Sequence, residues 1–154
     1  MRKGTNKKYH YTESGLDNIY LLNGYKVTTT KAGKEIFIHD IHGLHKAIGE
    51  NLALKQGLLS GKEIRFIRHL LDWSQTRLAH ATGVNYQSIL RWEKHKGSIS
   101  ITADRSIKWL CLAYIKSPDI YNIINEISEM DSKEDTVVQK LEFKEDDGKW
   151  RMSA

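Results

Sequence analysis

The chain has 154 residues, a hydrophobic content of 40% and a formal net charge of +5 at pH 7. This length fits one medium domain or two small ones, and the hydrophobic content is sufficient for a buried core. The one cysteine, Cys111, excludes an internal disulfide and a multi-cysteine zinc site, and no apolar run is long enough to span a membrane.

The N-terminal part predicts a small antiparallel β-meander followed by a helix. Ile19–Leu22 and Tyr25–Thr30 have strand character and are joined by Asn23-Gly24, which is a type I′ hairpin signal. Glu35–His39 predicts a third strand, and the apolar residues after it recur at helical spacing. Because so small a meander is unstable alone, residues 1–57 are expected to form a module that packs on something larger.

Three helix signals follow in close succession. Ser60 and Glu63 have the spacing of a capping box, which predicts a helix start. A second short helix ends at Gly83, where a left-handed residue is favoured. Asn85 then caps a third helix over about residues 86–94. Two short helices joined by a tight turn that contains glycine predict a helix-turn-helix.

The residues of this segment resemble the Cro/repressor-type (Xre) helix-turn-helix family. The matching residues are Trp73-Ser74-Gln75, Leu78-Ala79, Gly83-Val84, Ile89 and Arg91-Trp92-Glu93. The resemblance implies a lambda-repressor-like domain of five-helix type over residues 58–130, in which the helix after the Gly-Val turn enters the major groove. The expected fold class is therefore α+β, mainly α.

Charge is concentrated on this predicted domain. Residues 55–116 hold eleven Lys and Arg against four Asp and Glu, a net charge of +7. Residues 117–154 hold five against ten, a net charge of −5. A basic surface releases counterions from a polyanion and so supplies affinity that is independent of sequence. The basic segment coincides with the motif, which favours DNA as the partner.

The third helix carries the candidate base contacts. Gln87 and Arg91 are four residues apart and share a face, whereas Ile89 and Trp92 are expected in the core. Arginine suits guanine and glutamine suits adenine in the major groove. Further base-contact candidates near the helix start are Asn85, Tyr86 and Ser88. Candidates for phosphate contacts are Ser74, Gln75, Arg77, Lys94, His95 and Lys96. The resemblance implies that Gln75 also braces the recognition helix, and we expect Glu93 to pair with a nearby basic group.

Two apolar helices are predicted after the motif. Thr102 is the expected cap of the first, and Pro118 occupies the first position of the second. Their apolar residues form either a dimer interface or further core packing within the chain. The interface candidates are Trp109, Leu112, Ile120, Ile123, Ile124 and Ile127. Residues 131–154 form an acidic tail, for which a hairpin and disorder are both open.

The N-terminal part resembles a second group, the MqsA-like antitoxins and related regulators, in which such a module precedes an Xre-type helix-turn-helix. The matching segments are Tyr9 to Asn18, with the pattern Tyr-x-Tyr-Thr-Glu-Ser-Gly-Leu-Asp-Asn, then Asn23-Gly24, and Ile38-His-Asp-x-x-Gly-Leu-His. The founding antitoxins carry a four-cysteine zinc site there, and this sequence has no cysteine in that part. We therefore expect neither a metal nor a cofactor, and a toxin protein is a candidate partner.

Two weaker constellations could support catalysis. His39, His42 and His45 are three residues apart, and Glu13 and Asp17 could form an acid/base pair. Structural roles are the preferred interpretation of both, and the sequence shows no glycine-rich phosphate loop or nucleophile elbow.

The sequence therefore predicts a non-enzymatic regulator in the bacterial cytoplasm, associated with the nucleoid. As a homodimeric repressor it would bind a palindromic operator in double-stranded DNA. The alternative is the antitoxin of a type II toxin–antitoxin pair, which would bind its toxin through the N-terminal module. A metal-dependent enzyme is the third hypothesis.

Overall fold

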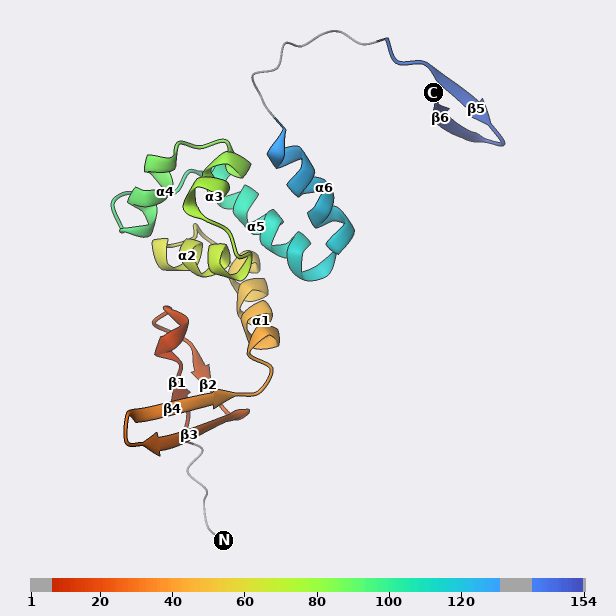
Figure 1. The fold of residues 1–154 in the computed structure, drawn as a ribbon. Helices are drawn as coiled ribbons and strands as arrows, with labels where there is room; N and C mark the ends of the chain where they lie inside the picture. The colour runs from red at the N-terminus through yellow and green to blue at the C-terminus, as the bar shows by residue number, and fades with distance from the viewer. Residues whose placement is uncertain (1–6, 131–139, 154) are drawn as a thin grey trace.

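The computed structural model describes residues 7–130 and 140–153. Over these residues the fold is α+β, with six α-helices and short antiparallel strand pairs. The helices are α1 (Ile41–Leu54), α2 (Gly61–Leu70), α3 (Gln75–Thr82), α4 (Tyr86–Glu93), α5 (Ile101–Lys116) and α6 (Pro118–Glu129). Figure 1 shows the N-terminal strands at one end, helices α2 to α6 grouped at the other, and α1 between them.

The N-terminal strands form two separate pairs, so the predicted three-stranded meander is wrong. Strand β2 (Tyr20–Leu21) pairs with β1 (Tyr9–His10), and a short 3₁₀ turn, η1 (Thr12–Ser14), lies between them. A type I′ turn requires positive φ at both central residues. Gly24 has a φ of 76°, whereas Asn23 is not among the residues with positive φ. The Asn23-Gly24 segment therefore leads from one strand pair to the next.

The second pair is a regular hairpin. Strand β3 (Tyr25–Thr30) pairs with β4 (Gly33–Ile38) in the register Tyr25↔Ile38 to Thr30↔Gly33. The backbone N–H of His39 donates to the carbonyl of Gly24 at 2.9 Å and continues this ladder by one bond. The predicted strands at 25–30 and 35–39 are thus confirmed as partners of each other.

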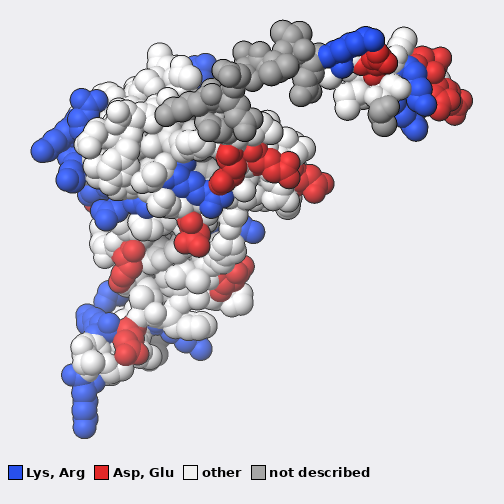
Figure 2. Space-filling model, turned by 45° about the horizontal axis from the view of Figure 1, so that its top comes forward, with Lys and Arg blue, Asp and Glu red and all other residues white. Residues whose placement is uncertain are grey.

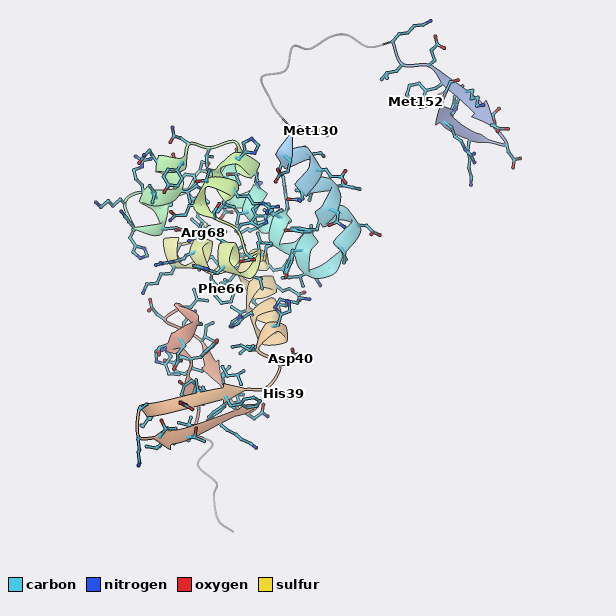
Figure 3. The ribbon with its side chains drawn as sticks, in the orientation of Figure 1. His39, Asp40, Phe66, Arg68, Met130 and Met152 are labelled. Carbon is cyan, nitrogen blue, oxygen red and sulfur yellow. The ribbon has the colours of Figure 1, made fainter. Side chains whose placement is uncertain are left out.

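Helix α1 joins the strands to the other helices. Its cap is Asp40, whose carboxylate accepts from the Gly43 N–H at 3.2 Å. Near its middle, Ile48 packs in a small N-terminal cluster with Tyr11, Leu16, Leu21 and Phe66. Figure 3 shows Phe66 on the side of α2 that faces the strands. The N-terminal strands therefore rest on α1 and α2.

The far end of α1 packs in the main core. Ala53 belongs to the larger cluster, and α1 crosses α5 where Gly49 and Cys111 meet. A Cβ on Gly49 would lie 2.6 Å from Leu70 Cδ2 and 3.3 Å from Cys111 Sγ, so glycine permits this close approach. Helix α1, although placed before the predicted boundary at residue 57, therefore shares the core of the helices that follow it.

The main core lies among α2, α3, α4 and α5. The side chains with almost no exposure in it are Ile64, Ile67, Leu78, Ile89, Ile107 and Cys111. Predicted helix starts are also confirmed here. Ser60 Oγ accepts from the Glu63 N–H and Glu63 Oε1 accepts from the Ser60 N–H, which completes the capping box.

A buried ion pair holds the segment between α1 and α2 against α5. Asp104 is 3% exposed, accepts from the Leu59 N–H at 2.7 Å and pairs with Lys108 at 2.9 Å. Lys108 also donates to the Gly57 carbonyl at 2.7 Å. Because these groups satisfy one another away from water, the connecting segment has a defined path.

Helices α5 and α6 extend this core, and each start tests a predicted cap. The cap of α5 is Ser100, whose hydroxyl accepts from the Ala103 N–H at 3.2 Å, so the prediction of Thr102 is wrong by two residues. Pro118 does occupy the first turn of α6, as predicted. Ser100 and Thr102 are both short polar residues that precede apolar residues at helical spacing, and the helix is capped by the earlier of the two.

The C-terminal residues form a hairpin, which was one of the two alternatives predicted for the tail. Strand β5 (Phe143–Asp146) pairs with β6 (Lys149–Met152), with Phe143 opposite Met152 and Glu145 opposite Trp150. Residues 131–139 of the predicted tail lie outside the described residues.

Candidate nucleic-acid interface

The segment from α3 to α4 has local features that place its two helices. Ser74 Oγ accepts from the Arg77 N–H at 3.1 Å, and Gly83 ends α3 with a φ of 67°. Asn85 Oδ1 accepts from the Gln87 N–H at 2.8 Å and begins α4. The predicted caps and the left-handed glycine are confirmed. They make the turn short, and α4 packs against α3.

Helix α4 divides into a buried and an exposed face. Ile89 is fully buried and Trp92 is 7% exposed, both in the main core. Gln87 and Arg91 are exposed. Because these pairs lie on different sides of the helix, burial of the indole and the isoleucine fixes the direction in which the amide and the guanidinium point.

A buried ion pair anchors the C-terminal end of α4. Arg68 Nε donates to Glu93 Oε1 at 2.7 Å and Arg68 Nη2 donates to Oε2 at 3.2 Å. The side chains are only 10% and 4% exposed. Gln75 Nε2 donates to the same carboxylate, and Arg68 Nη1 donates to the Trp73 carbonyl at 3.0 Å. One carboxylate on α4 therefore holds α2 and α3, as expected for Glu93 and for Gln75 as a brace.

Figure 3 shows Arg68 on the side of α2 away from the N-terminal strands. The sequence predicted a basic partner for Glu93 but did not identify Arg68, which lies twenty-five positions earlier. Arg68 occurs in a helix with other basic residues, and no local spacing distinguishes it from them. Only the packing of α2 on α4 selects it.

The turn after α4 presents a basic surface. Lys94, His95 and Lys96 are all exposed, and His95 adopts a left-handed backbone with a φ of 61°. Figure 2 shows Lys and Arg side chains along the edge where Figure 1 places α4, and Asp and Glu side chains on the side of α6. Positive charge and the polar face of α4 therefore occur together.

The other candidate contacts lie at the starts of α3 and α4, and they differ in how far their side chains are free to contact DNA. Tyr86 is 39% exposed, and its hydroxyl is 3.5 Å from Gln75 Oε1. Ser88 is half-buried. The side-chain oxygen of Asn85 serves the helix cap, and that of Ser74 serves the cap of α3.

Arg77 differs from the other predicted phosphate contacts, because its charge is committed within the chain. Its guanidinium lies over the Trp73 ring, 4.6 Å from the centroid, and Nη2 donates to Asn125 Oδ1 at 2.5 Å. Nη2 also lies 3.8 Å from a Glu129 carboxylate oxygen. These contacts join α3 to α6, so Arg77 has a structural role that the sequence did not indicate.

The predicted dimer residues separate into two groups. Leu112 and Ile124 are partly buried and pack on the main core. Trp109, Ile120, Ile123 and Ile127 are 65%, 53%, 56% and 60% exposed. The latter three recur along α6 at helical spacing and leave one apolar stripe uncovered.

The catalytic constellations do not assemble. Among residues 7–130 and 140–153, no group of three or more His, Cys, Asp and Glu side chains could hold a metal ion. His45 Nε2 is instead 2.8 Å from the Tyr11 hydroxyl. Asp17 pairs with Lys62, which lowers the pKa of its carboxyl, and Glu13 accepts from the Tyr9 hydroxyl at 2.5 Å.

No protein-family model, curated protein or solved structure matches the chain. None of the helices over the described residues is long and apolar enough to cross a membrane.

Proposed function

We propose that the chain is a sequence-specific DNA-binding regulator that places α4 in the major groove. The observation that carries the proposal is the division of α4 into a buried face, with Ile89 and Trp92, and an exposed face, with Gln87 and Arg91. A helix held in this way presents its polar side chains without losing core packing. An α-helix of this kind fits the width of the major groove.

The exposed residues supply both kinds of contact that specific DNA binding needs. Arg91 suits the two acceptors of guanine and Gln87 suits the donor and acceptor of adenine, and each such contact discriminates by about 1–3 kcal/mol. Lys94 and Lys96 follow immediately and suit the phosphates, whose neutralisation supplies salt-dependent affinity. The ion pair of Arg68 with Glu93 keeps α4 in place for both.

A two-fold dimer would extend this to a palindromic operator. The exposed stripe Ile120, Ile123 and Ile127 on α6 is the candidate contact between two copies. Such a dimer binds half-sites about 34–36 Å apart along the duplex. Occupancy of an operator near a promoter would block transcription, which is the simplest form of repression.

The test compares affinity for the DNA upstream of the gene with affinity for random DNA of equal length at one salt concentration. We expect preference for the upstream DNA. Arg91→Ala reduces this preference by about 1–3 kcal/mol, and Lys96→Ala weakens both complexes to a similar extent. Arg105→Ala, an exposed arginine on α5, is the matched control and leaves both affinities nearly unchanged. Equal affinity of the wild type for the two DNAs contradicts the proposal.

The oligomeric state is tested separately by sedimentation of the full chain with and without operator DNA. We expect a dimer on the DNA, and we expect Ile123→Glu to prevent it while leaving the fold intact, because Ile123 is 56% exposed. A wild-type complex with one chain per operator contradicts the two-fold arrangement.

A second candidate function is the antitoxin, favoured by the N-terminal strand pairs. Tyr20, Leu22, Val27 and Phe37 are 54%, 65%, 44% and 64% exposed, and among the strands of the described residues β3 and β4 pair only with each other. Exposed apolar side chains on strands with free edges are typical of a surface that another protein covers.

The test of this candidate is co-purification of the chain with the product of any small neighbouring reading frame. We expect Phe37→Ser to release that product while DNA binding persists. If no neighbouring product binds the chain, the antitoxin candidate is excluded and the regulator remains.

A further inference from the structure

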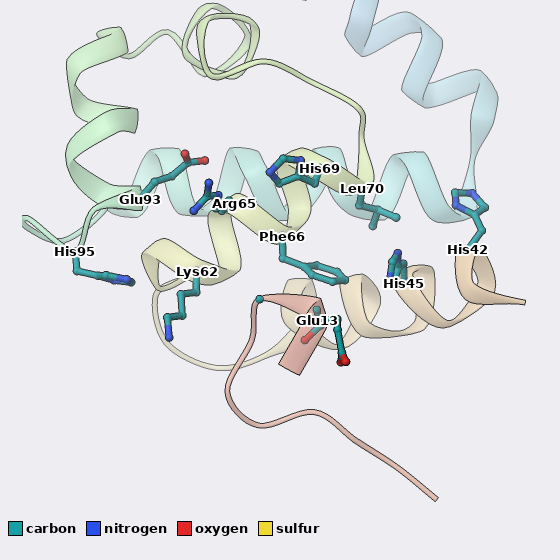
Figure 4. A pocket seen from close by; sticks show the side chains of 12 residues that line it. Glu13, His42, His45, Lys62, Arg65, Phe66, His69, Leu70, Glu93 and His95 are labelled. Carbon is teal, nitrogen blue, oxygen red and sulfur yellow. The ribbon is translucent and has the colours of Figure 1, made fainter. Parts of the chain in front are cut away.

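A cavity of about 560 Å³ lies between the N-terminal strands and the helices. One wall is α2, the ends are formed by α1 and by the turn after α4, and η1 closes the opposite side. Figure 4 shows α2 across the cavity, with His95 at one end, His45 and His42 toward the other, and Glu13 opposite Phe66. This volume is within the range of small-molecule sites, which are concave and few per protein.

One face of α2 lines the cavity with nitrogen donors. Lys62, Arg65 and His69 are three and four residues apart, so they follow one another along a single side of the helix. His95 adds a further ring from the turn after α4. Burial lowers the pKa of His69, so at neutral pH its ring is uncharged and offers one N–H. The row therefore offers several donors and two full positive charges.

Two of the other Lys, Arg, Asp and Glu side chains that line the cavity are already matched by opposite charges, and a third, Glu13, accepts from the Tyr9 hydroxyl. Lys62 lies 2.8 Å from both carboxylate oxygens of Asp17. The Glu93 carboxylate is occupied by Arg68 and Gln75. Arg65 forms no hydrogen bond or ion pair with any residue in the described part of the chain. Its guanidinium is planar and matches an oxygen anion with two parallel donors.

The other end of the cavity is aromatic. Phe66 and His45 line it, with ring centroids 5.5 Å apart and planes nearly perpendicular. Burial lowers the pKa of His45, and its ring is also hydrogen-bonded to the Tyr11 hydroxyl, so both of these rings are uncharged at neutral pH. Edge-to-face rings favour a flat apolar group beside them.

We propose that this cavity binds a small molecule in which a phosphate or carboxylate group is joined to a flat apolar body, and that its occupancy changes DNA affinity. The second half rests on the proposed function. The oxygens contact Arg65 and its neighbours on α2, and the body lies against Phe66. The path to DNA is short: Arg68, which holds Glu93 of α4, follows Arg65 on the same helix, and His95 borders both the cavity and the basic turn.

The experiment first measures binding to the full chain without DNA, by calorimetry, with phenyl phosphate, benzoate and inorganic phosphate as probes. We expect saturable binding of phenyl phosphate or benzoate, and the stronger of the two identifies the anionic group. Because the phenyl ring lies against Phe66, we expect inorganic phosphate to bind at least about tenfold more weakly than phenyl phosphate. Arg65→Gln weakens the preferred probe about tenfold, the loss of one charge-assisted contact, and Arg105→Gln leaves it unchanged.

Absence of saturable binding by both organic probes overturns the site, as does binding that Arg65→Gln leaves unchanged. A third result would also overturn it. If random DNA displaces the probe and Arg65→Gln weakens binding to random DNA by the same factor, the row on α2 is a phosphate-backbone contact of DNA.

The second measurement adds saturating probe to the complex with upstream DNA. We expect a change of at least about threefold in DNA affinity, which Arg65→Gln removes. Unchanged DNA affinity with intact probe binding overturns the regulatory half of the proposal. If the wild-type chain without probe shows no preference for the upstream DNA, the proposed function is contradicted. The binding site itself is not, because the calorimetric result does not depend on DNA.

Discussion

Replacing Glu93 with glutamine tests whether the anchor of α4 is energetically important. Glu93→Gln keeps the size of the side chain and removes the charge that faces Arg68. The guanidinium then remains buried, at 10% exposure, without its counter-ion. Loss of one partner from a buried ion pair costs about 3–5 kcal/mol, and because the amide is isosteric we expect this variant to lose about 3 kcal/mol. For a chain of this length the melting temperature falls by about 6–12 °C.

The assay is urea unfolding followed by tryptophan fluorescence, since Trp73 and Trp92 are both buried beside the anchor. Glu50→Gln is the matched control, because Glu50 also pairs with a cation, Lys116, at 2.6 Å, but with the two side chains 34% and 57% exposed. A pair so exposed contributes about 1 kcal/mol or less. Equal losses in the two variants would refute the reasoning, because burial would then make no difference.

A double replacement separates the lost charge from the lost contact. Arg68→Met with Glu93→Leu removes both charges and fills the space with apolar atoms. Replacing a whole buried pair in this way is often neutral or stabilising. The remaining cost is the Trp73 carbonyl, which loses its donor from Arg68, and the Gln75 amide, which loses its acceptor on Glu93, at about 1 kcal/mol each. A double variant as unstable as Glu93→Gln would show that shape, not charge, governs this site.

Three further outcomes follow from single positions. Gly61→Ala destabilises the fold by about 1–3 kcal/mol in urea unfolding, because the added Cβ would lie 2.0 Å from the Trp92 carbonyl oxygen; a stabilised variant would contradict this contact. Stability falls as the pH drops from about 7.5 to 5.5, partly because burial lowers the folded-state pKa of His45 below its usual 6.5, and protonation then favours the unfolded chain. His45→Gln, which can keep a hydrogen bond to Tyr11, makes the urea midpoint depend less on pH. If the midpoint of this variant depends on pH as strongly as that of the wild type, His45 is not the source of the effect. Cys111 is fully buried, and burial raises its pKa to about 12. We therefore expect a thiol reagent at about pH 8 to modify it at least about a thousandfold more slowly in the native chain than in urea. Similar rates of modification would contradict its burial.

Local signals predicted the helices well. The capping box at Ser60, the caps at Ser74 and Asn85 and the left-handed Gly83 each depend on residues within four positions of one another. Such interactions form wherever the rest of the chain lies, so they can be recognised without a structure. The exposed face of α4 followed in the same way, from the spacing of Ile89 and Trp92.

Strand pairing was predicted less well. A dipeptide such as Asn23-Gly24 favours a hairpin, but the partner of β2 was decided by burial of Leu21 in a cluster with Tyr11 and Leu16. That contact lies outside the turn, and short strands have too few residues to specify a partner by themselves. The commitment of Arg77 to α6 has the same origin, because no local pattern links positions 77 and 125.

By itself the sequence determined where α2, α3 and α4 begin, which side of α4 is apolar, and where positive charge accumulates, since each depends on neighbours along the chain. Only the tertiary structure decided which buried cation meets Glu93, why residue 61 has to be a glycine, and that the donors of α2 border a cavity against the N-terminal strands. These features join segments far apart in the chain. Their energies come from close packing and from charges removed from water, which exist only when the elements are assembled.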